Sequence, residues 1–533
     1  MVHDTGESVD AVVIGAGHNG LVAASMLADA GWDVLVLEAQ PEPGGAVRSA
    51  ELTPGYVTDL YSSFYPMSAA SPAITALHLE DHGLRWSHAP AVVAHPRNGA
   101  DDEIPVIHRD PARTATELEH LQPGDGENWW RLVQLWETIK KPFMDAILAP
   151  FPPVRPSLQL LRKLGTAEAL RLANLIVQPA NAMASRLFDG EAAQLLLLGN
   201  AMHADAPPDA PGSGAFGFLL MMLAQDVGWP VPVGGSGKLT AALVNRACSA
   251  GAHIECGQTV SRIHVKGGRA VAVSTAQGRT VRARRAIVAD VTAPRLFCDM
   301  LPNDAVPAAL LRELDHYTWD LPVVKVNYTL REPIPWRSQK LAGVGTVHLG
   351  ADADGLIRWM ADLNTRVVPE DPFLLLGQTT TADATRSPEG TESVWAYTHL
   401  PRDVADNGSA EKLAVTMDRV IEDHAPGFGD RVIGRFVQRP SDLEASNANL
   451  FRGAVNGGTS QLQQMLIFRP APGMGRAETP VERLYLGSAS ATPGGSVHGA
   501  CGRNAANAAL RADGALRWPR RKMTHQIMSL LTK

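Results

Sequence analysis

The stretch Ala11-Val-Val-Ile-Gly15-Ala-Gly17-His-Asn-Gly20 decides the fold class of this chain, because a short apolar run leads directly into a glycine-rich turn. Gly15 permits a tight turn out of a β-strand, and Gly17 lets backbone N–H groups approach a pyrophosphate. Gly20 allows the following helix to pack closely on the sheet, with its positive N-terminal end facing the anion. The spacing therefore predicts a strand, a turn and a helix that hold a dinucleotide.

The residues after this turn complete the predicted unit. Residues 21–31 carry apolar side chains at helical spacing and end at a glycine, and residues 33–38 form a second apolar strand. Glu38 closes that strand, where a carboxylate accepts hydrogen bonds from a ribose diol. A glycine-rich turn alone is often only structural, but the strand, the helix and the acid at this spacing favour nucleotide binding.

Length and composition limit the class of protein. A chain of 533 residues with 45% apolar and 19% charged residues is expected to form two globular domains. The net charge of −7 and the lack of a basic stripe argue against a nucleic-acid partner. No apolar run reaches the length of a membrane span, and the acidic N-terminus lacks a secretory signal, so we expect a cytoplasmic protein.

The cysteines argue against two kinds of chemistry. Cys248, Cys256, Cys298 and Cys501 are scattered and form no C-x-x-C pair, which a disulfide reductase needs. The 17 histidines form no ligand-spaced cluster with them, so no metal site is expected. We interpret the cysteines as small apolar core residues.

Two further glycine-rich segments extend the predicted nucleotide site. Pro43-Gly44-Gly45-Ala46-Val47-Arg48 follows Glu38, and its backbone and arginine suit the far side of a pyrophosphate. A surface turn with a solvated arginine is the alternative. Near the C-terminus, Leu484-Tyr-Leu-Gly487-Ser-Ala-Ser-Ala-Thr-Pro493-Gly494-Gly495-Ser-Val-His498-Gly499 indicates a strand, a glycine loop and a helix start, where backbone amides again meet a ligand.

The segments between these motifs indicate a second domain. Short strands and glycine turns across residues 230–290 favour a return of the chain to the nucleotide domain. Alternating strands at residues 321–330 and 392–399 are typical of a mixed or antiparallel sheet that forms one wall of a pocket. Residues 127–147 predict a helix with one apolar face, which forms either plain core or a wall over an apolar substrate.

The three glycine-rich segments, in this order, resemble the phytoene desaturase-like branch of FAD-dependent oxidoreductases, which is related more distantly to the amine oxidases. The resemblance covers nearly the whole chain and is closest to the pyridine nucleotide-disulphide oxidoreductase domain-containing protein 2-like family. Its specific parts are the Gly15 to Glu38 unit, Gly44-Gly45, Pro232-Val-Gly-Gly235, Ile467-Phe468-Arg469-Pro470 and Thr492-Pro-Gly-Gly-Ser-Val-His-Gly499.

This resemblance implies an α/β fold with two interleaved domains. A Rossmann-type FAD-binding domain, three-layered around a parallel sheet, takes residues 1–95, 229–293 and 477–515. A helical insertion into the substrate domain takes residues 96–228, and a substrate domain with a mixed β-sheet takes residues 294–476. Residues 516–533 form a basic C-terminal tail.

The resemblance also implies FAD as cofactor and assigns residues to it. Its adenine end lies in the first unit, with Gly15, Gly17, Gly20 and Glu38. The other assigned residues are Gly44, Gly45 and Arg48 beside the pyrophosphate, Val260 beside the adenine, and Gly487, Ser488 and Val497 beside the ribityl chain and isoalloxazine. Ala46 stands where amine oxidases usually have arginine, and Ser488 where flavoproteins often have an acid, so both contacts depart from the family pattern.

Catalytic residues are hypotheses at this point. A flavin accepts a hydride at N5, and the helix after Gly495 would stabilise charge at its pyrimidine edge, near residues 497–499. Lys325 lies in a strand that resembles the lysine-bearing strand of amine oxidases; the alternative is a surface lysine on an edge strand. For His498, four roles are open: it acts as a base, it orients the substrate, it caps the helix, or it forms a hydrogen bond with the flavin. For Arg469, one hypothesis is that it binds the polar end of a substrate; the alternative is a solvated or ion-paired side chain.

We therefore expect an FAD-dependent dehydrogenase or desaturase that removes a hydride from carbon in an apolar, isoprenoid or lipid-like small molecule. A flavin amine oxidase-like enzyme is one alternative. A flavoprotein whose structural FAD serves partner proteins is another, and assembly as a homo-oligomer stays open. The tail, basic over residues 516–522 and apolar after Met523, favours peripheral contact with an anionic membrane; a solvated tail is the alternative.

Overall fold

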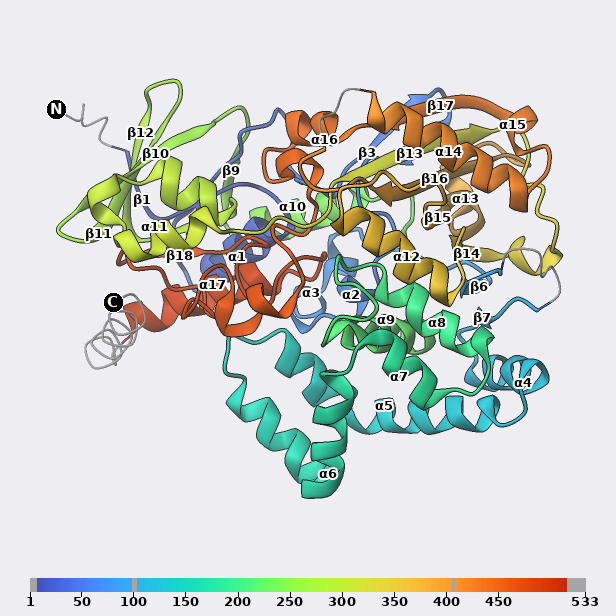
Figure 1. Cartoon of the computed structure of the whole chain (residues 1–533). Helices are drawn as coiled ribbons and strands as arrows, with labels where there is room; N and C mark the ends of the chain where they lie inside the picture. The colour runs from blue at the N-terminus through green and yellow to red at the C-terminus, as the bar shows by residue number, and fades with distance from the viewer. Residues whose placement is uncertain (1–6, 98–102, 405–407, 515–533) are drawn as a thin grey trace.

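The computed structural model describes residues 7–97, 103–404 and 408–514, and it contains two seven-stranded sheets (Figure 1). The first sheet has the order β10-β11-β12-β1-β2-β9, with β18 paired to β12. Its strands come from three separate parts of the chain: β1 (Ser8–Ile14), β2 (Val34–Leu37), β9 (His253–Glu255), β10 (Val260–Lys266), β11 (Arg269–Thr275), β12 (Thr280–Ala289) and β18 (Leu484–Leu486).

The centre of the first sheet is parallel and buried on both faces. β1 pairs in parallel with β2 and β12, and its side chains alternate between two apolar clusters. One cluster joins the sheet to three helices, α1 (His18–Asp29), α10 (Gly237–Ser249) and α17 (Ala500–Asp513). The other joins it to the hairpin β10–β11 and to α11 (Ala308–Asp315). The predicted Rossmann-type fold is therefore confirmed, since parallel strands buried on both faces are typical of this architecture.

The second sheet is mixed and has the order β17-β13-β16-β15-β14-β6-β7. Only β6 and β14 pair in parallel, and the other neighbours are antiparallel. Its strands are β6 (Ala91–Ala94), β7 (Val106–Ile107), β13 (Val323–Leu330), β14 (Val344–Leu349), β15 (Leu374–Gln378), β16 (Glu392–His399) and β17 (Val432–Gln438). The alternating strands expected at residues 321–330 and 392–399 are thus confirmed as neighbours in one sheet.

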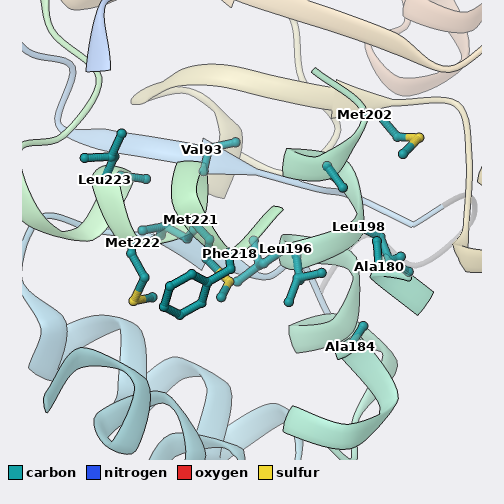
Figure 2. Packing of buried hydrophobic residues seen from close by; sticks show 14 of the residues in the cluster. Val93, Ala180, Ala184, Leu196, Leu198, Met202, Phe218, Met221, Met222 and Leu223 are labelled. Atoms are coloured by element: carbon teal, nitrogen blue, oxygen red, sulfur yellow. The ribbon is translucent and has the colours of Figure 1, made fainter. Parts of the chain in front are cut away.

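Helices cover the two faces of the second sheet. α14 (Ser409–His424) packs on one face, against Val324, Val326 and Tyr328. The other face meets α12 (Ala353–Asn364) and a helical layer of α4 (Pro111–Leu121), α5 (Asp125–Ile147), α7 (Ala180–Leu187), α8 (Glu191–Ala201) and α9 (Ser213–Asp226). Figure 2 shows how closely this layer packs, with Leu196 of α8 and Phe218, Met221 and Met222 of α9 gathered beside Val93 of β6. The apolar stripe predicted for residues 127–147 lies in this core, where Trp129, Trp136 and Ile139 are fully buried.

The smaller elements connect the two sheets. Two-stranded sheets join β3 (Ser49–Thr53) to β4 (Tyr56–Asp59) and β5 (Trp86–Ser87) to β8 (Val231–Pro232). Short helices α2 (Pro66–Ala70), α3 (Pro72–Thr75), α13 (Thr379–Ala382), α15 (Phe428–Arg431) and α16 (Pro440–Ser446) lie in the connections. A longer, bent helix, α6 (Val154–Ile176), projects from the lower side of the molecule in Figure 1. Within the described ranges, no helix combines the length and apolar content needed to cross a membrane.

Candidate functional site

The glycine turn between β1 and α1 leaves no room for side chains. Gly15 has φ +97°, a conformation that side-chain-bearing residues rarely adopt. A Cβ on Gly20 would lie 2.1 Å from the carbonyl oxygen of Gly15, and one on Gly17 would lie 2.8 Å from Oδ2 of Asp290. The three predicted glycines therefore form a cradle of backbone at the N-terminal end of α1, where amide groups attract an anion.

Glu38 lies at the carboxyl end of β2, directly beside this cradle. Its Oε2 accepts a hydrogen bond from the backbone N–H of Ala16 at 2.7 Å, and its Oε1 accepts one from Gln40 at 2.8 Å. The side chain is largely buried. These two amides fix the carboxylate next to the glycine turn, as the sequence spacing predicted.

The second glycine turn packs against the first. The N–H of Gly44 donates to the carbonyl of Ala16 at 2.8 Å, and a Cβ on Gly45 would lie 3.2 Å from Cα of Gly17. Arg48 donates from Nη2 to the hydroxyl of Tyr61 at 2.6 Å, while its Nε is buried without a partner in the described part of the chain. The alternative of a solvated surface arginine is therefore wrong.

The third segment brings α17 next to α1. The N–H of Gly487 donates to the carbonyl of Ala289 at 2.9 Å, next to the parallel pairing of β18 with β12, the neighbour of β1. A Cβ on Gly502 would lie 1.9 Å from the carbonyl oxygen of Asn19, so the two helices touch through backbone. Three of the remaining predicted residues lie in this region: Ser488 is buried and accepts the N–H of Ser490, Gly495 faces Asn456, and the carbonyl of Val497 accepts from Ser68. Val260 lies elsewhere, at the start of β10, in the apolar cluster that also holds Leu35 and Leu37 of β2.

Two buried nitrogen atoms test whether these residues fit a dinucleotide. His18, the first residue of α1, has its Nε2 buried without a hydrogen-bond partner among the described residues, as does Nε of Arg48. Buried donors and acceptors are normally paired, so each unpaired nitrogen calls for a partner that the chain itself does not supply. Phosphate and ribose oxygens beside the cradle would supply both. The residues therefore fit the group that the glycine pattern predicts.

Asp290 belongs to this site and was missed by the sequence reasoning. Its Oδ2 accepts the N–H of Gly20 at 3.0 Å, at the N-terminal end of α1. Burial raises the pKa of the carboxyl group to about 7. The sequence could have placed Asp290 beside the glycine turn. This residue directly follows a predicted strand, and the carboxyl ends of parallel strands meet at one edge of the sheet.

Lys325 lies in the interior of the second sheet. β13 has a neighbour on each side, β16 and β17, and Lys325 is 3% exposed, so the alternative of a surface lysine on an edge strand is wrong. Its Nζ donates to the carbonyl oxygens of Asp59 and Tyr61, the latter at 2.9 Å. Burial lowers the pKa of this lysine to about 7, although Asp59 opposes the shift. A neutral amine that donates two hydrogen bonds keeps a lone pair free for a proton.

His498 caps the last helix. Its Nδ1 accepts the N–H of Ala500 at 3.0 Å, and the side chain is 2% exposed. Burial lowers its pKa to about 3. Of the roles that the sequence left open, this geometry favours the cap, since the Nδ1 lone pair is already occupied; a catalytic role stays a prediction.

Arg469 is held mainly by backbone carbonyl groups, with one further contact to Sδ of Met465. The buried guanidinium donates to the carbonyl oxygens of Asn456 at 2.8 Å, Thr459 at 2.9 Å and Ala489 at 2.7 Å. It is neither solvated nor paired with a carboxylate in the described part of the chain. These contacts occupy its donors and shape the loop before β18.

An aromatic wall extends from Lys325 along the second sheet. Nζ of Lys325 lies 5.9 Å from the ring centre of Trp395, which contacts Phe64 at 6.0 Å and Tyr397 at 5.8 Å. Tyr397 in turn contacts His399 at 5.8 Å. We call these four residues, Phe64, Trp395, Tyr397 and His399, the aromatic wall. The wall borders an apolar cluster that also contains the helical layer and Ala500 at the start of α17.

Comparison with known proteins identifies the family to which this chain is related. Residues 20–394 match the family described as flavin containing amine oxidoreductase. The chain is 28% identical to pyridine nucleotide-disulfide oxidoreductase domain-containing protein 2 of Mus musculus, over 94% of this chain and 93% of that protein. It is 25% identical to a zeta-carotene-forming phytoene desaturase of Myxococcus xanthus, over 91% and 90% of the two chains.

Solved structures share the fold. A putrescine oxidase bound to putrescine aligns with a TM-score of 0.60 at 14% identity, over 95% of this chain and 98% of that chain. The predicted resemblance to phytoene desaturase-like oxidoreductases is confirmed by the sequence relatives. The assignment of Gly15, Gly17 and Gly20 to the nucleotide stays a prediction, with which their close-packed backbone is consistent. The chain therefore belongs to the flavin containing amine oxidoreductase family, and its cofactor is FAD.

Proposed function

We propose that this flavoprotein is a dehydrogenase of the desaturase type, which removes a hydride from a carbon atom of an apolar, isoprenoid or lipid-like substrate. The observation that carries the proposal is the aromatic wall, because it places apolar surface beside Lys325 and in one cluster with Ala500 of the last flavin-binding segment. Apolar and aromatic side chains beside a single amine favour a substrate with few charges. The phytoene desaturase among the relatives is named for such chemistry.

The chain's own residues have defined tasks in this proposal. FAD supplies the hydride acceptor when it is bound. The wall residues orient the substrate and exclude water. Lys325 takes the proton that leaves the neighbouring carbon, since its lone pair is free and its pKa near 7 suits a base at neutral pH.

Amine oxidation is the second candidate. The family is described by that reaction, and the putrescine oxidase shares the fold. Either reaction starts with hydride removal from carbon, so the substrate separates them.

The test is anaerobic mixing of the FAD-loaded protein with the isoprenoid hydrocarbon limonene and its ketone carvone, and with cyclohexylamine and putrescine as amines. Bleaching of the visible flavin absorbance reports hydride transfer. We expect at least one of the two isoprenoids to bleach the flavin, and Lys325→Met to slow the reaction by about tenfold or more. Lys266→Met, at an exposed position on β10, is the matched control.

Bleaching by the amines alone would replace the first candidate with the second. An unchanged rate in Lys325→Met would remove the lysine from the mechanism. If nothing bleaches the flavin and partner proteins co-purify in stoichiometric amounts, the FAD is structural and both candidates fail.

A further inference from the structure

Four histidines form a row between α8 and the second sheet; His95, His348 and His399 are buried, and His203 is partly buried. His95 follows β6, His348 lies on β14, His203 follows α8, and His399 ends β16. Nε2 of His203 lies 3.0 Å from Nε2 of His348, and the rings of His95 and His348 are 5.6 Å apart. In the part of the chain that the structure describes, no group of three ligand-forming side chains is arranged to hold a metal ion. The row therefore needs another explanation.

The proton positions in this row follow from its contacts. Nδ1 of His95 and Nδ1 of His348 are buried and unpaired, and both face Gly199, where a Cβ would lie 2.5 and 2.4 Å from them. An N–H aimed at this CH2 group would be a buried donor without an acceptor, whereas a lone pair gains a weak C–H contact. Nδ1 of His348 is therefore unprotonated, and so is Nδ1 of His95, because Nε2 of His95 must donate to the carbonyl of Ala351 at 2.8 Å.

It follows that Nε2 of His348 carries the proton and donates to His203. His203 must then carry its own proton on Nδ1. That atom has no hydrogen-bond partner among the described residues, yet it is absent from the fully buried unpaired atoms, and the ring keeps accessible surface. Burial nevertheless lowers the pKa of His203 to about 3.

Tyr397 offers a second unused group. It is the one residue of β16 that is not fully buried, and its hydroxyl forms no hydrogen bond with the described residues. Its ring contacts His399, whose charge interaction with His203 connects the two positions. An N–H donor and a hydroxyl thus face accessible space along the aromatic wall.

We infer that His203 and Tyr397 bind a neutral oxygen atom of the substrate, so that the substrate is an apolar molecule carrying a carbonyl, hydroxyl or ether group. The inference rests on the proposed function and narrows its substrate class. A pure hydrocarbon would leave both donors unpaired, which disfavours its binding.

The surrounding charges favour a neutral oxygen over an ion. The histidines stay uncharged at neutral pH, so they give a carboxylate no cation to pair with. The nearest acid, Asp205, already accepts from Arg402 at 2.6 Å, Thr459 at 2.7 Å and the N–H of Ser460 at 2.6 Å. An ammonium group would therefore find no free carboxylate there.

The test uses two probes with one carbon skeleton, limonene and its ketone carvone, titrated into the FAD-loaded protein by calorimetry. We expect carvone to bind about fivefold more tightly than limonene, the value of one hydrogen bond. Tyr397→Phe and His203→Phe should each remove most of this preference and leave limonene binding unchanged. Tyr56→Phe is the matched control, because its hydroxyl is bonded within the protein to Leu330.

Equal binding of the two probes, or an undiminished preference in Tyr397→Phe, would overturn the inference. Flavin absorbance serves as the check that each variant is folded. If His203→Phe does not fold, Tyr397→Phe alone decides the test. A separate measurement of flavin bleaching keeps the two ideas distinct. Carvone preference without bleaching by any substrate overturns only the proposed function; bleaching by limonene without carvone preference overturns only this inference.

A second, independent observation concerns the outer surface of α6. Eight of the thirteen exposed large apolar side chains in the described part of the chain lie on or next to this helix: Val154, Leu158, Leu161, Leu170, Val177, Leu462, Leu466 and Phe468. The loop that carries the last three touches both ends of α6. Leu462 packs on Gly212, whose N–H donates to Val177, and Leu466 lies by Gly475, whose carbonyl accepts from Phe151. These eight residues lie on α6 or in segments next to its ends, and we name them the α6 patch.

The shape and charge of α6 indicate what this patch meets. The helix bends at Gly165 and projects from the body of the protein (Figure 1), with only Leu172 and Leu175 buried. Its charged residues are Arg155, Arg162, Lys163 and Arg171 against a single acid, Glu168, in a chain whose net charge is −7. Exposed leucines beside basic side chains are typical of helices that lie on anionic membranes.

We propose that the α6 patch docks on an anionic lipid bilayer. Co-sedimentation with vesicles of phosphatidylcholine, with and without phosphatidylglycerol, tests this. We expect binding only to the anionic vesicles, and Leu161→Glu with Leu170→Glu should weaken it by about tenfold or more. Val415→Glu, at an equally exposed apolar position on α14, is the control. A chain that ends at residue 515 should still bind, which separates the patch from the tail.

Three outcomes would overturn the proposal. In the first, the wild-type chain would not sediment with anionic vesicles. In the second, the double variant would bind as the wild type does. In the third, ultracentrifugation would show that the α6 patch joins two copies of the chain. The predicted membrane contact of the tail, residues 516–533, lies outside the described residues and stays a prediction.

Discussion

The predicted nucleotide end and the proposed substrate end of this protein use different chemical groups of the chain: backbone at one end and side chains at the other. At the nucleotide end, Gly15, Gly17 and Gly20 offer backbone groups, and their lack of side chains is the essential property. At the substrate end, Lys325 and Tyr397 offer side chains from neighbouring strands of a mixed sheet. Backbone recognition needs a short local motif, whereas side-chain recognition needs residues that only the fold brings together.

The first prediction tests the backbone site and has the largest expected effect. Gly20→Ala places a methyl group 2.1 Å from the carbonyl oxygen of Gly15, so the turn must open. We expect the affinity for FAD to fall by at least about a thousandfold, or the FAD-binding domain not to fold. Fluorescence titration of the apoprotein with FAD measures it.

The control lies in the same half of the molecule. A Cβ on Gly237, at the start of α10, has its nearest contact at 3.5 Å, so Gly237→Ala should bind FAD like the wild type. Tight binding by Gly20→Ala would show that the turn adjusts freely, and would remove the distinction drawn between the two ends.

The same distinction explains what the sequence could predict. The strands, the glycine turns and Glu38 follow from local spacing, so the Rossmann-type fold and the nucleotide cradle were predictable. Asp290 and the histidine row were not predicted, since their partners are distant in sequence: Asp290 reaches Gly20, and His95 meets His348. The burial of Lys325 depends on β17 pairing beside β13, and no local pattern reports which strand is internal.

The second prediction tests the packing of the histidine row. Gly199→Ala places a methyl group 2.4 Å from Nδ1 of His348 and 2.5 Å from Nδ1 of His95, and both rings are fixed by hydrogen bonds. We expect the free energy of unfolding to fall by about 3 kcal/mol. Urea unfolding followed by tryptophan fluorescence measures this.

Gly429→Ala, in the short helix α15, serves as the reference, because its nearest contact would be an ordinary 3.6 Å. That variant should be neutral or slightly more stable. Equal stability of the Gly199 and Gly429 variants would mean that the rings move aside easily, and the proton positions assigned to them would lose their basis.

The third prediction concerns acid. Burial lowers the pKa of His95 and His399 to about 4 and that of His203 to about 3, below the ordinary value of 6.5. The folded protein therefore binds fewer protons than the unfolded chain between about pH 4 and pH 6.5, so its stability falls as the pH decreases through this window. Each histidine contributes at most about 1.4 kcal/mol per pH unit.

The free energy of unfolding, measured from about pH 7 to about pH 5, should show this loss. His203→Phe should reduce the slope of this free energy against pH by the equivalent of about one bound proton. The tryptophans of the helical layer, Trp129 and Trp136, report on the half that holds the row. A slope that His203→Phe leaves intact would place the acid sensitivity elsewhere, with His18 and His498 of the nucleotide half as the next candidates.

The smallest effect is expected for Glu38→Gln, because it changes a side chain where backbone makes the site. The amide keeps one oxygen for the N–H of Ala16 or of Gln40, and loses the charge and the second acceptor. We expect the affinity for FAD to fall by about fivefold to tenfold, the value of one charge-assisted hydrogen bond. The titration used for Gly20→Ala measures it. A loss as large as that of Gly20→Ala would mean that this carboxylate, rather than the glycine backbone, dominates nucleotide binding, and the two ends of the protein would then recognise their ligands in the same way.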